Sequence, residues 1–359
     1  MPLWQATLPF RIYERKMAYI TLNAQHFKHN LNLITNHIKH ISNQHCQVAL
    51  VLKDNAYGHG LLEMAQLAKQ NGIKNVFVKN HTEAKLIAPL FESITILYGM
   101  PQGNLAPNMA IAINNKDILD SLHSGDKVEL KINAQMNRNG ISFNEIKEYI
   151  DIIESKKLNL FGVFSHNGYG DDGGEDFVQS REVFTHIKEQ VKEICENKGL
   201  PIPRFHFLSS SGALRVDKID DELVRIGIGA YGYLESNLAI ANDLHPVAAL
   251  FAHKINTKML HKGDKIGYDG KTVLKKDTTI STYDIGYGDG LPRIDEHKNI
   301  YCASGEMILP RTSMDCFSCE SQKSEICVFD DVRGIAKAFH TISYEILTRL
   351  SPSIPRVII

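Results

Sequence analysis

The apolar run Gln47-Val-Ala-Leu-Val-Leu52 is followed at once by Lys53-Asp-Asn-Ala-Tyr57-Gly-His-Gly60, and this stretch decides the fold. Its first half is a short, continuous run of β-prone residues, which is typical of a strand buried on both faces. Its second half begins with a lysine and continues with residues that favour a turn. The stretch therefore predicts a buried strand with a lysine at its carboxyl end.

Seven further runs of the same kind follow along the chain, and helical patterns separate most of them. The runs lie at 75–79, 94–98, 109–113, 127–132, 160–165, 204–209 and 223–228. Helical patterns fill 60–72, 144–155 and 175–197, and the last of these is closed by Gly199. Eight strands that alternate with helices are what a parallel (β/α)8 barrel of the TIM type requires. The predicted fold class is therefore α/β.

The two ends of the chain differ from this alternating region. Residues 1–16 have no periodic pattern, and Met17 opens a strand-like run, so 1–16 are set apart as an extension whose native status is left open. After residue 245 the runs, among them 299–304 and 307–314, become short, alternating and separated by Gly, Asp and Lys turns, and a final helical pattern covers 344–350. We therefore predict a barrel domain over 17–245 and a separate antiparallel β domain over 246–359.

Composition limits the possible functions. The chain has 359 residues with 40 Lys and Arg against 41 Asp and Glu, so its formal net charge is −1 with histidine neutral. Nucleic-acid binding relies on concentrated positive charge, so this balance argues against such a partner. No apolar run approaches the roughly 18 residues that a membrane span needs, and the N-terminus has no signal-peptide pattern. We expect a soluble, cytoplasmic protein.

Two motifs with a known chemical use are set aside. Cys316 and Cys319 have a metal-like spacing, but a second pair at zinc-finger distance is missing and their surroundings alternate as in a strand. We expect structural cysteines and no metal site. Residues 168–173 and 227–232 match G-x-G-x-x-G, but neither opens a βαβ unit with an acidic residue about 20 positions on, so a dinucleotide site is rejected.

The predicted barrel mouth combines two chemical features. Lys53 stands at the end of the first strand, where a desolvated amine can form a Schiff base. Ser209-Ser210-Ser211-Gly212 follows the seventh strand, and Arg225, Gly227 and Ile228 lie in and after the eighth. Loops after strands 7 and 8 are the usual phosphate site of these barrels. Singly, the lysine could be solvated surface and the serines an ordinary turn; together they predict pyridoxal 5′-phosphate (PLP).

Several motifs, taken in order, resemble those of the alanine racemases, which are PLP enzymes with an N-terminal barrel and a C-terminal β domain. The resemblance runs from about Met17 to Ile359. It is carried by the stretch 51–60, Lys131 with Arg138 and Gly140, Ser165-His166, the stretch 224–232, Ile266-Gly-Tyr268, the stretch 285–290, and Ser313-Met314-Asp315.

The resemblance implies a role for each of these residues. Lys53 would bind PLP and act as a base on one face of the substrate, and Tyr268, contributed by the second subunit of a homodimer, would act on the other face. Arg138 and the Met314 amide would bind the substrate carboxylate, and Lys131 would be a carbamylated lysine that anchors Arg138. The cofactor-binding residues would be Lys53, Tyr57, Arg138, His166, Ser210, Arg225, Gly227 and Ile228.

The sequence departs from the family pattern at several places. Asn133-Ala134-Gln135 replaces the usual Asp-Thr-Gly, Asp269 follows Tyr268, and Pro352 stands where many members have a phosphate-binding tyrosine. Carbamylation of Lys131 and the substrate preference are therefore left open. The predicted function is an alanine racemase that supplies D-alanine for peptidoglycan. The alternatives are a racemase of broader specificity, a fold-related amino-acid decarboxylase and a PLP-binding protein without turnover.

Overall fold

The computed structural model describes residues 17–359, so the predicted extension 1–16 lies outside the described residues. The described chain forms two compact units. The barrel unit comprises Leu22–Ala248, Thr341–Thr348 and Ile358–Ile359. The C-terminal unit comprises 17–21, Ala249–His340 and Arg349–Val357. A short segment near the end of the chain, Thr341–Thr348, thus belongs to the barrel unit.

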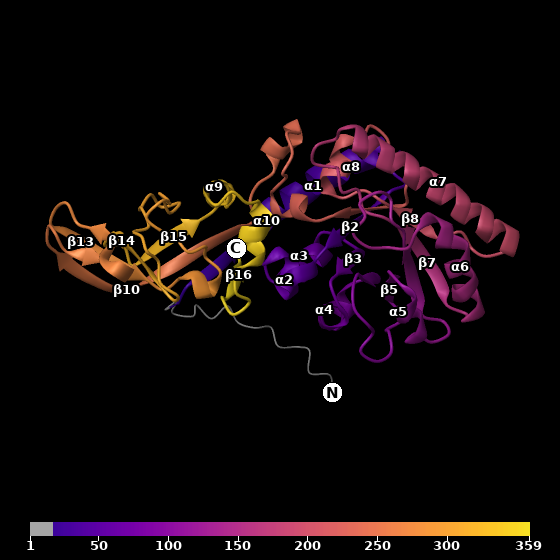
Figure 1. Cartoon of the computed structure of the whole chain (residues 1–359), viewed down its shortest axis with the longest axis horizontal. Coiled ribbons are helices and arrows are strands. Elements are labelled where there is room, and N and C mark those ends of the chain that lie inside the picture. Colours follow the sequence, from indigo (N-terminus) through magenta and orange to yellow (C-terminus); the bar gives the residue numbers. More distant parts are fainter. Residues whose placement is uncertain (1–16) are drawn as a thin grey trace. The chain divides into compact units, whose positions relative to one another are not determined.

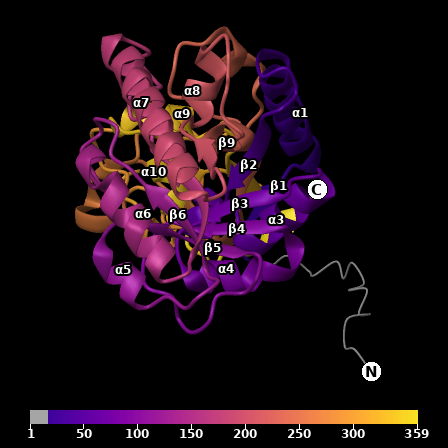
Figure 2. The same cartoon turned by 90° about the vertical axis from the view of Figure 1, so that its right-hand side faces the viewer.

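The barrel unit is built on an eight-stranded parallel sheet, as the apolar runs predict (Figures 1 and 2). The strand order is β8-β7-β6-β5-β4-β3-β2-β9. The Arg225 amide of β9 donates to the Leu208 carbonyl just after β8 at 3.0 Å, which brings the two outer strands together. The strands are β2 (Gln47–Val51), β3 (Asn75–Val78), β4 (Ser93–Ile96), β5 (Met109–Ile113), β6 (Lys127–Lys131), β7 (Asn159–Phe164), β8 (Arg204–His206) and β9 (Leu223–Ile226).

Helices surround this sheet (Figure 2), and the longer ones present an apolar stripe to it. In α1 the buried residues Phe27, Leu31, Ile34 and Ile38 recur at helical spacing, and the side chain of Asn23 caps the first turn. The helices are α1 (Ala24–Ile41), α2 (Lys53–Tyr57), α3 (Leu61–Gln70), α4 (His81–Ile87), α5 (Lys116–Asp120), α6 (Ile146–Ser155), α7 (Glu175–Lys198), α8 (Ser210–Arg215) and α10 (Ser343–Thr348).

The C-terminal unit is built on antiparallel strand pairs, as predicted. Strand β10 pairs with β13 and with β15, and β13 pairs with β14. The main path of the sheet is β14-β13-β10-β1-β16. The elements are β1 (Tyr19–Leu22), β10 (Ala248–Leu260), β11 (Lys265–Ile266), β12 (Thr272–Val273), β13 (Thr278–Tyr283), β14 (Phe317–Glu320), β15 (Glu325–Phe329), β16 (Arg356–Ile358) and α9 (Arg333–Ala338).

One part of the strand prediction for the C-terminal unit is wrong. Segments 299–304 and 307–314 form isolated bridges instead of strands, at Tyr301 with Met307 and at Leu309 with Ser318. Gly305 turns the chain between them with φ +99°, and Pro310 has no amide hydrogen to donate to a ladder. Of the two spaced cysteines, Cys319 is buried on β14 and Cys316 is half-buried just before that strand, and both are free.

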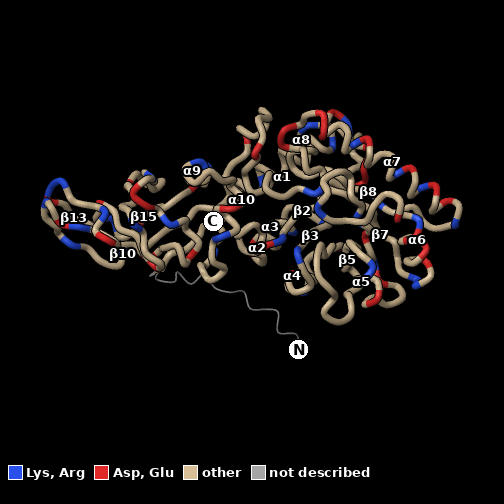
Figure 3. The backbone as a smooth tube through the Cα atoms, viewed as in Figure 1, with Lys and Arg blue, Asp and Glu red and all other residues tan. Residues whose placement is uncertain are grey.

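Charges of both signs are interleaved along the surface helices, most visibly on α7 (Figure 3). This arrangement agrees with the balanced composition. Within residues 17–359, no helix has both the length and the apolar character that a bilayer crossing requires.

Gly58 provides a test of how the turn after β2 is packed. Its φ is +80°, and an added Cβ would lie 1.9 Å from the Leu347 carbonyl oxygen. We expect Gly58→Ala to lower the free energy of unfolding by about 3 kcal/mol or more, because backbone has to move in addition to the left-handed strain. The matched control is Gly72→Ala, where φ is +78° and an added Cβ meets nothing within 4 Å.

For Gly72→Ala we expect a loss of about 1 kcal/mol from backbone conformation alone. Urea unfolding of both variants measures the difference. Equal losses at the two positions would show that the contact of Gly58 with the segment around Leu347 is not tight.

Candidate functional site

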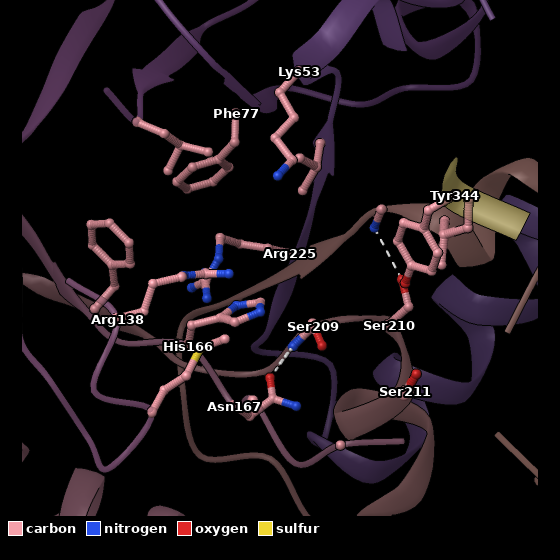
Figure 4. A pocket seen from close by; sticks show the side chains of 18 of the residues that line it. Lys53, Phe77, Arg138, His166, Asn167, Ser209, Ser210, Ser211, Arg225 and Tyr344 are labelled. Atoms are coloured by element: carbon pink, nitrogen blue, oxygen red, sulfur yellow. Dashed lines mark hydrogen bonds between the residues drawn. The ribbon is translucent and has the colours of Figure 1, made fainter. Parts of the chain in front are cut away.

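A cavity of about 280 Å³ lies in the barrel unit (Figure 4). Its walls come from the residues at and just beyond the carboxyl ends of the parallel strands, where barrel enzymes place their chemistry. Eight of the ten predicted site residues line it: Lys53, Tyr57, Arg138, His166, Ser210, Arg225, Gly227 and Ile228. The other two, Tyr268 and Met314, belong to the C-terminal unit, and both side chains are exposed.

The turn after β2 brings Lys53 and Tyr57 to the same cavity. Residues 54–56 all have left-handed backbone conformations, with φ between 52° and 55°, which is unusual for three consecutive residues other than glycine. The Asn55 side chain holds the turn by accepting a hydrogen bond from the Leu61 amide at 2.8 Å. The ammonium of Lys53 consequently lies 6.0 Å from the centre of the Tyr57 ring.

Ser210 and Gly227 form the part of the cavity suited to a phosphate. The Ser210 hydroxyl accepts hydrogen bonds from the amides of Gly227 at 3.0 Å and Gly229 at 3.3 Å. An added Cβ at Gly227 would lie 2.6 Å from the Tyr57 hydroxyl, so only glycine fits there. The hydroxyls of Ser210 and Tyr57 and the backbone at Gly227 therefore lie together at one end of the cavity, where hydroxyl donors suit an anion.

Tyr344 of α10 also lines the cavity, and sequence reasoning missed it (Figure 4). Its ring centre lies 5.8 Å from that of Tyr57, and burial raises the pKa of its phenol. Pro352 is expected to stand where many family members have a phosphate-binding tyrosine, and the structure places a tyrosine at the cavity eight residues earlier. The helical pattern that begins at Tyr344 was the available signal.

The cavity is strongly cationic. Among the described residues that line it, Lys53, Lys131, Arg138 and Arg225 carry positive charge, and Asp171 is the single carboxylate. The Asp171 carboxylate already accepts a hydrogen bond from Ser211 at 2.5 Å. An anionic ligand would relieve the repulsion among these cations. A phosphate-bearing group such as PLP therefore fits both the charge of the cavity and its glycine-lined end.

Burial and the neighbouring positive charges lower the pKa of two groups at the cavity, Lys131 and His166. Burial, followed by the charges of Arg138, Arg225 and Lys53, lowers the pKa of Lys131 to about 7. The Lys131 amine donates to the side-chain oxygen of Asn139. Burial, followed by Arg225, also lowers the pKa of His166 well below its usual value. The neutral form of an amine reacts with carbon dioxide, and Lys131 is partly neutral at physiological pH. Carbamylation of Lys131 therefore stays a prediction that this environment favours.

The pKa of Lys131 predicts how stability changes with pH. The unfolded chain keeps this amine protonated up to about pH 10, whereas the folded chain loses the proton near pH 7. The folded state therefore binds fewer protons between these values, and the cost of burying Lys131 falls as pH rises. From pH 7 to pH 9 we expect the PLP-free protein to gain about 2 kcal/mol of stability relative to Lys131→Met.

Urea unfolding of both proteins at the two pH values measures this gain. The contributions of the other titrating groups to the pH dependence are nearly the same in both proteins and cancel in the comparison. A gain of the same size in Lys131→Met would mean that the pH dependence comes from another residue.

The fold and the cavity define a class: a (β/α)8-barrel enzyme with a lysine-bearing, cationic cavity, joined to a C-terminal β unit. Residues 22–235 match the family described as "Alanine racemase, N-terminal domain", and residues 247–358 match "Alanine racemase, C-terminal domain". The chain belongs to the alanine racemase family.

Individual relatives agree with this assignment. The chain is 38% identical over 340 residues to the alanine racemase of Campylobacter concisus, which covers 95% of this chain and 99% of the relative. It is 36% identical over 341 residues to that of Nitratiruptor sp., with 95% and 99% covered. Among solved structures, the alanine racemase of Bacillus anthracis with bound L-Ala-P has a TM-score of 0.80, 25% identity and 95% of both chains covered. That of Bartonella henselae with covalently bound pyridoxal phosphate has a TM-score of 0.80, 20% identity and 96% and 99% covered, and shows the fold.

Proposed function

We propose that the protein is a PLP-dependent alanine racemase, an isomerase that interconverts L-alanine and D-alanine. The observation that carries the proposal is the cavity, where a lysine on a strained turn, a hydroxyl and glycine cradle, and a buried arginine meet in one cationic space. Membership of the family supplies the reaction. D-alanine made in the cytoplasm would serve peptidoglycan synthesis.

The cavity residues suit PLP in distinct ways. Lys53 would hold the cofactor through its amine. The phosphate would bind among Tyr57, Ser210, Gly227, Ile228 and Tyr344, whose hydroxyls and amides line one end of the cavity. Bound PLP supplies an electron sink that makes the α-proton of an amino acid acidic. Because a permanent cation at Arg225 would keep the pyridine nitrogen unprotonated, this electron sink would be weakened and side reactions suppressed.

Racemisation requires one group to remove the α-proton and another to return a proton on the opposite face. Lys53 would serve one face and Tyr268, from the second subunit of a homodimer, the other. The side chain of Tyr268 is 58% exposed, so its hydroxyl is available to another copy of the chain. Arg138 and the Met314 amide would bind the alanine carboxylate.

A racemase of broader specificity is the second candidate. It is favoured by Met136 and Asn167, which line the cavity and come from loops that depart from the family pattern. Racemisation rates for alanine, serine and lysine distinguish the two functions. A decarboxylase would release carbon dioxide, and a PLP-binding protein without turnover would change none of the three amino acids.

Replacement of Lys53 tests the cofactor site. We expect Lys53→Ala to abolish racemisation and to leave no PLP attached to the protein after borohydride reduction, because the only proposed attachment point is gone. The control is Lys79→Ala. Lys79 is an exposed lysine that forms an ion pair with Asp54, the residue next to Lys53. Absorbance spectra and alanine turnover should be normal for this control. Full activity of Lys53→Ala would refute the assignment.

Replacement of Tyr268 tests the use of two faces. In heavy water, Tyr268→Phe should still exchange the α-proton of D-alanine through Lys53 but should lose exchange from L-alanine by at least about 100-fold, the scale of general acid–base catalysis. Proton NMR of the α-position measures both rates. Tyr301→Phe, at a tyrosine 61% exposed on the same unit, is the control and should exchange both enantiomers normally. Equal loss for both enantiomers would contradict a separate base for each face.

A further inference from the structure

A chain of charged and polar groups, all buried except the partly exposed Arg204, runs inside the barrel to Arg225. It consists of Arg204 and His206 on β8, Glu129 on β6 and Arg225 on β9. Glu129 and His206 have no exposed surface, and Arg225 is 6% exposed. Buried charges are costly unless their partners are well placed, so the hydrogen bonds of this chain determine what each group can do.

The two carboxylate oxygens of Glu129 have different partners. Oε1 accepts from Arg204 Nε at 3.1 Å and from its Nη2, and also from Thr95 Oγ1 at 3.1 Å. Oε2 lies 2.9 Å from His206 Nε2. Burial opposes ionisation of Glu129, but Arg204 and His206 outweigh it and lower its pKa. An ionised carboxylate can only accept, so His206 must carry a hydrogen on Nε2.

A hydrogen on Nε2 determines whether the other imidazole nitrogen, Nδ1, donates or accepts. Burial lowers the pKa of His206 to about 4 despite the opposing effect of Glu129, so the ring is neutral at pH 7. With its hydrogen on Nε2, the ring has a free lone pair on Nδ1, and Arg225 Nη1 lies 2.5 Å from it. The ring cannot easily turn away, because it stacks on Phe164 at 4.9 Å and meets the edge of Phe77 at 5.2 Å.

The other hydrogen bonds of the Arg225 guanidinium group use every N–H donor except one. Nη1 also donates to the His206 carbonyl at 3.1 Å, and Nη2 donates to the carbonyls of Ser165 at 2.6 Å and Phe207 at 3.1 Å. These partners account for all four hydrogens on the two Nη atoms. Among the described residues, the Nε hydrogen of Arg225 has no partner, so it is the donor that this arginine can offer to a ligand in the cavity.

We propose that Glu129 is a positioning residue of the racemase site: its carboxylate fixes the tautomer of His206, and His206 in turn holds Arg225 in the orientation that leaves its Nε hydrogen free. The consequence for catalysis rests on the proposed function, because it assumes that the free donor meets the pyridine nitrogen of PLP. The tautomer itself is a property of the protein alone.

Glutamine cannot replace Glu129 in this arrangement. If its carbonyl oxygen faces Arg204, its amide hydrogens face His206 Nε2, and the imidazole must move its hydrogen to Nδ1, where it meets a donor of Arg225. If the amide is turned round, its hydrogens face the donors of Arg204 and Thr95 instead. Because Arg204 presents two donors to Oε1, the first orientation is favoured, and Glu129→Gln should switch the tautomer of His206.

The experiment compares wild type, Glu129→Gln and the control Thr95→Val as PLP-loaded, ¹⁵N-histidine-labelled proteins. Thr95→Val removes one hydrogen bond from the same carboxylate but keeps its charge. Long-range ¹H–¹⁵N correlation at pH 7 reports the tautomer, and the His206 signal is identified by its absence in His206→Gln. We expect the Nε2–H form in wild type and Thr95→Val, and the Nδ1–H form in Glu129→Gln.

Kinetics and cofactor absorbance are measured on the same samples. For Glu129→Gln we expect kcat for L-alanine to fall on the order of 10- to 100-fold, the range known for outer-shell partners of metal ligands. KM should change less, because the proposed binding site of the alanine carboxylate does not include Arg204, Glu129 or His206. The absorbance maximum of bound PLP should shift in Glu129→Gln but not in Thr95→Val.

Three results would overturn the proposal: an Nδ1–H or doubly protonated His206 in wild type, an unchanged tautomer in Glu129→Gln, or a switched tautomer with unchanged kcat. The wild-type spectrum tests the predicted tautomer of His206 even if Glu129→Gln does not fold. If wild type shows the expected tautomer but does not racemise alanine, the proposed function fails, whereas the assignment of His206 by Glu129 stands.

Discussion

Repulsion among the cations at the barrel mouth is the constraint on which the site depends. Lys53, Lys131, Arg138 and Arg225 share one cavity with a single carboxylate among the described lining residues. Burial and then the like charges of Arg138, Arg225 and Lys53 lower the pKa of Lys131 to about 7. Folding therefore creates a site that is electrostatically incomplete until an anion enters it. In the proposed function, the phosphate of PLP at the glycine-lined end would supply this negative charge.

Backbone geometry directs these side chains as much as their chemistry does. The left-handed residues 54–56 turn the chain sharply after β2, so that Lys53 and Tyr57 face one space although only three residues separate them. The close contact between Gly227 and the Tyr57 hydroxyl then joins this turn to the chain after β9. The first and last strands of the barrel sequence are neighbours in the sheet, and this closure brings the lysine and the phosphate cradle together.

Much of this arrangement could be predicted from the sequence, for identifiable reasons. Parallel strands are buried on both faces, so each appears as a continuous apolar run, and Lys53 stands out because it interrupts such a run at its end. Tyr344 was missed because α10 joins the barrel unit only through the fold, far along the chain from the other site residues. Glu129 was missed because a single carboxylate inside an alternating strand is indistinguishable from a solvated one until its partners on β8 are known. Where Tyr268 and Met314 act stays a prediction, because it depends on a second copy of the chain.

The barrel interior separates charge along its length, and this explains how a buried arginine can serve the site. Residues two apart on a strand point to the same side, so β6 presents both Glu129 and Lys131 to the interior. Glu129 lies deeper and is fully buried, whereas Lys131 ends the strand at the cavity. Burial lowers the pKa of Arg225 to about 10, and Glu129 opposes this shift. The deep carboxylate of Glu129, together with that of the buried Asp221, thus opposes the loss of the positive charge on Arg225 at the barrel mouth.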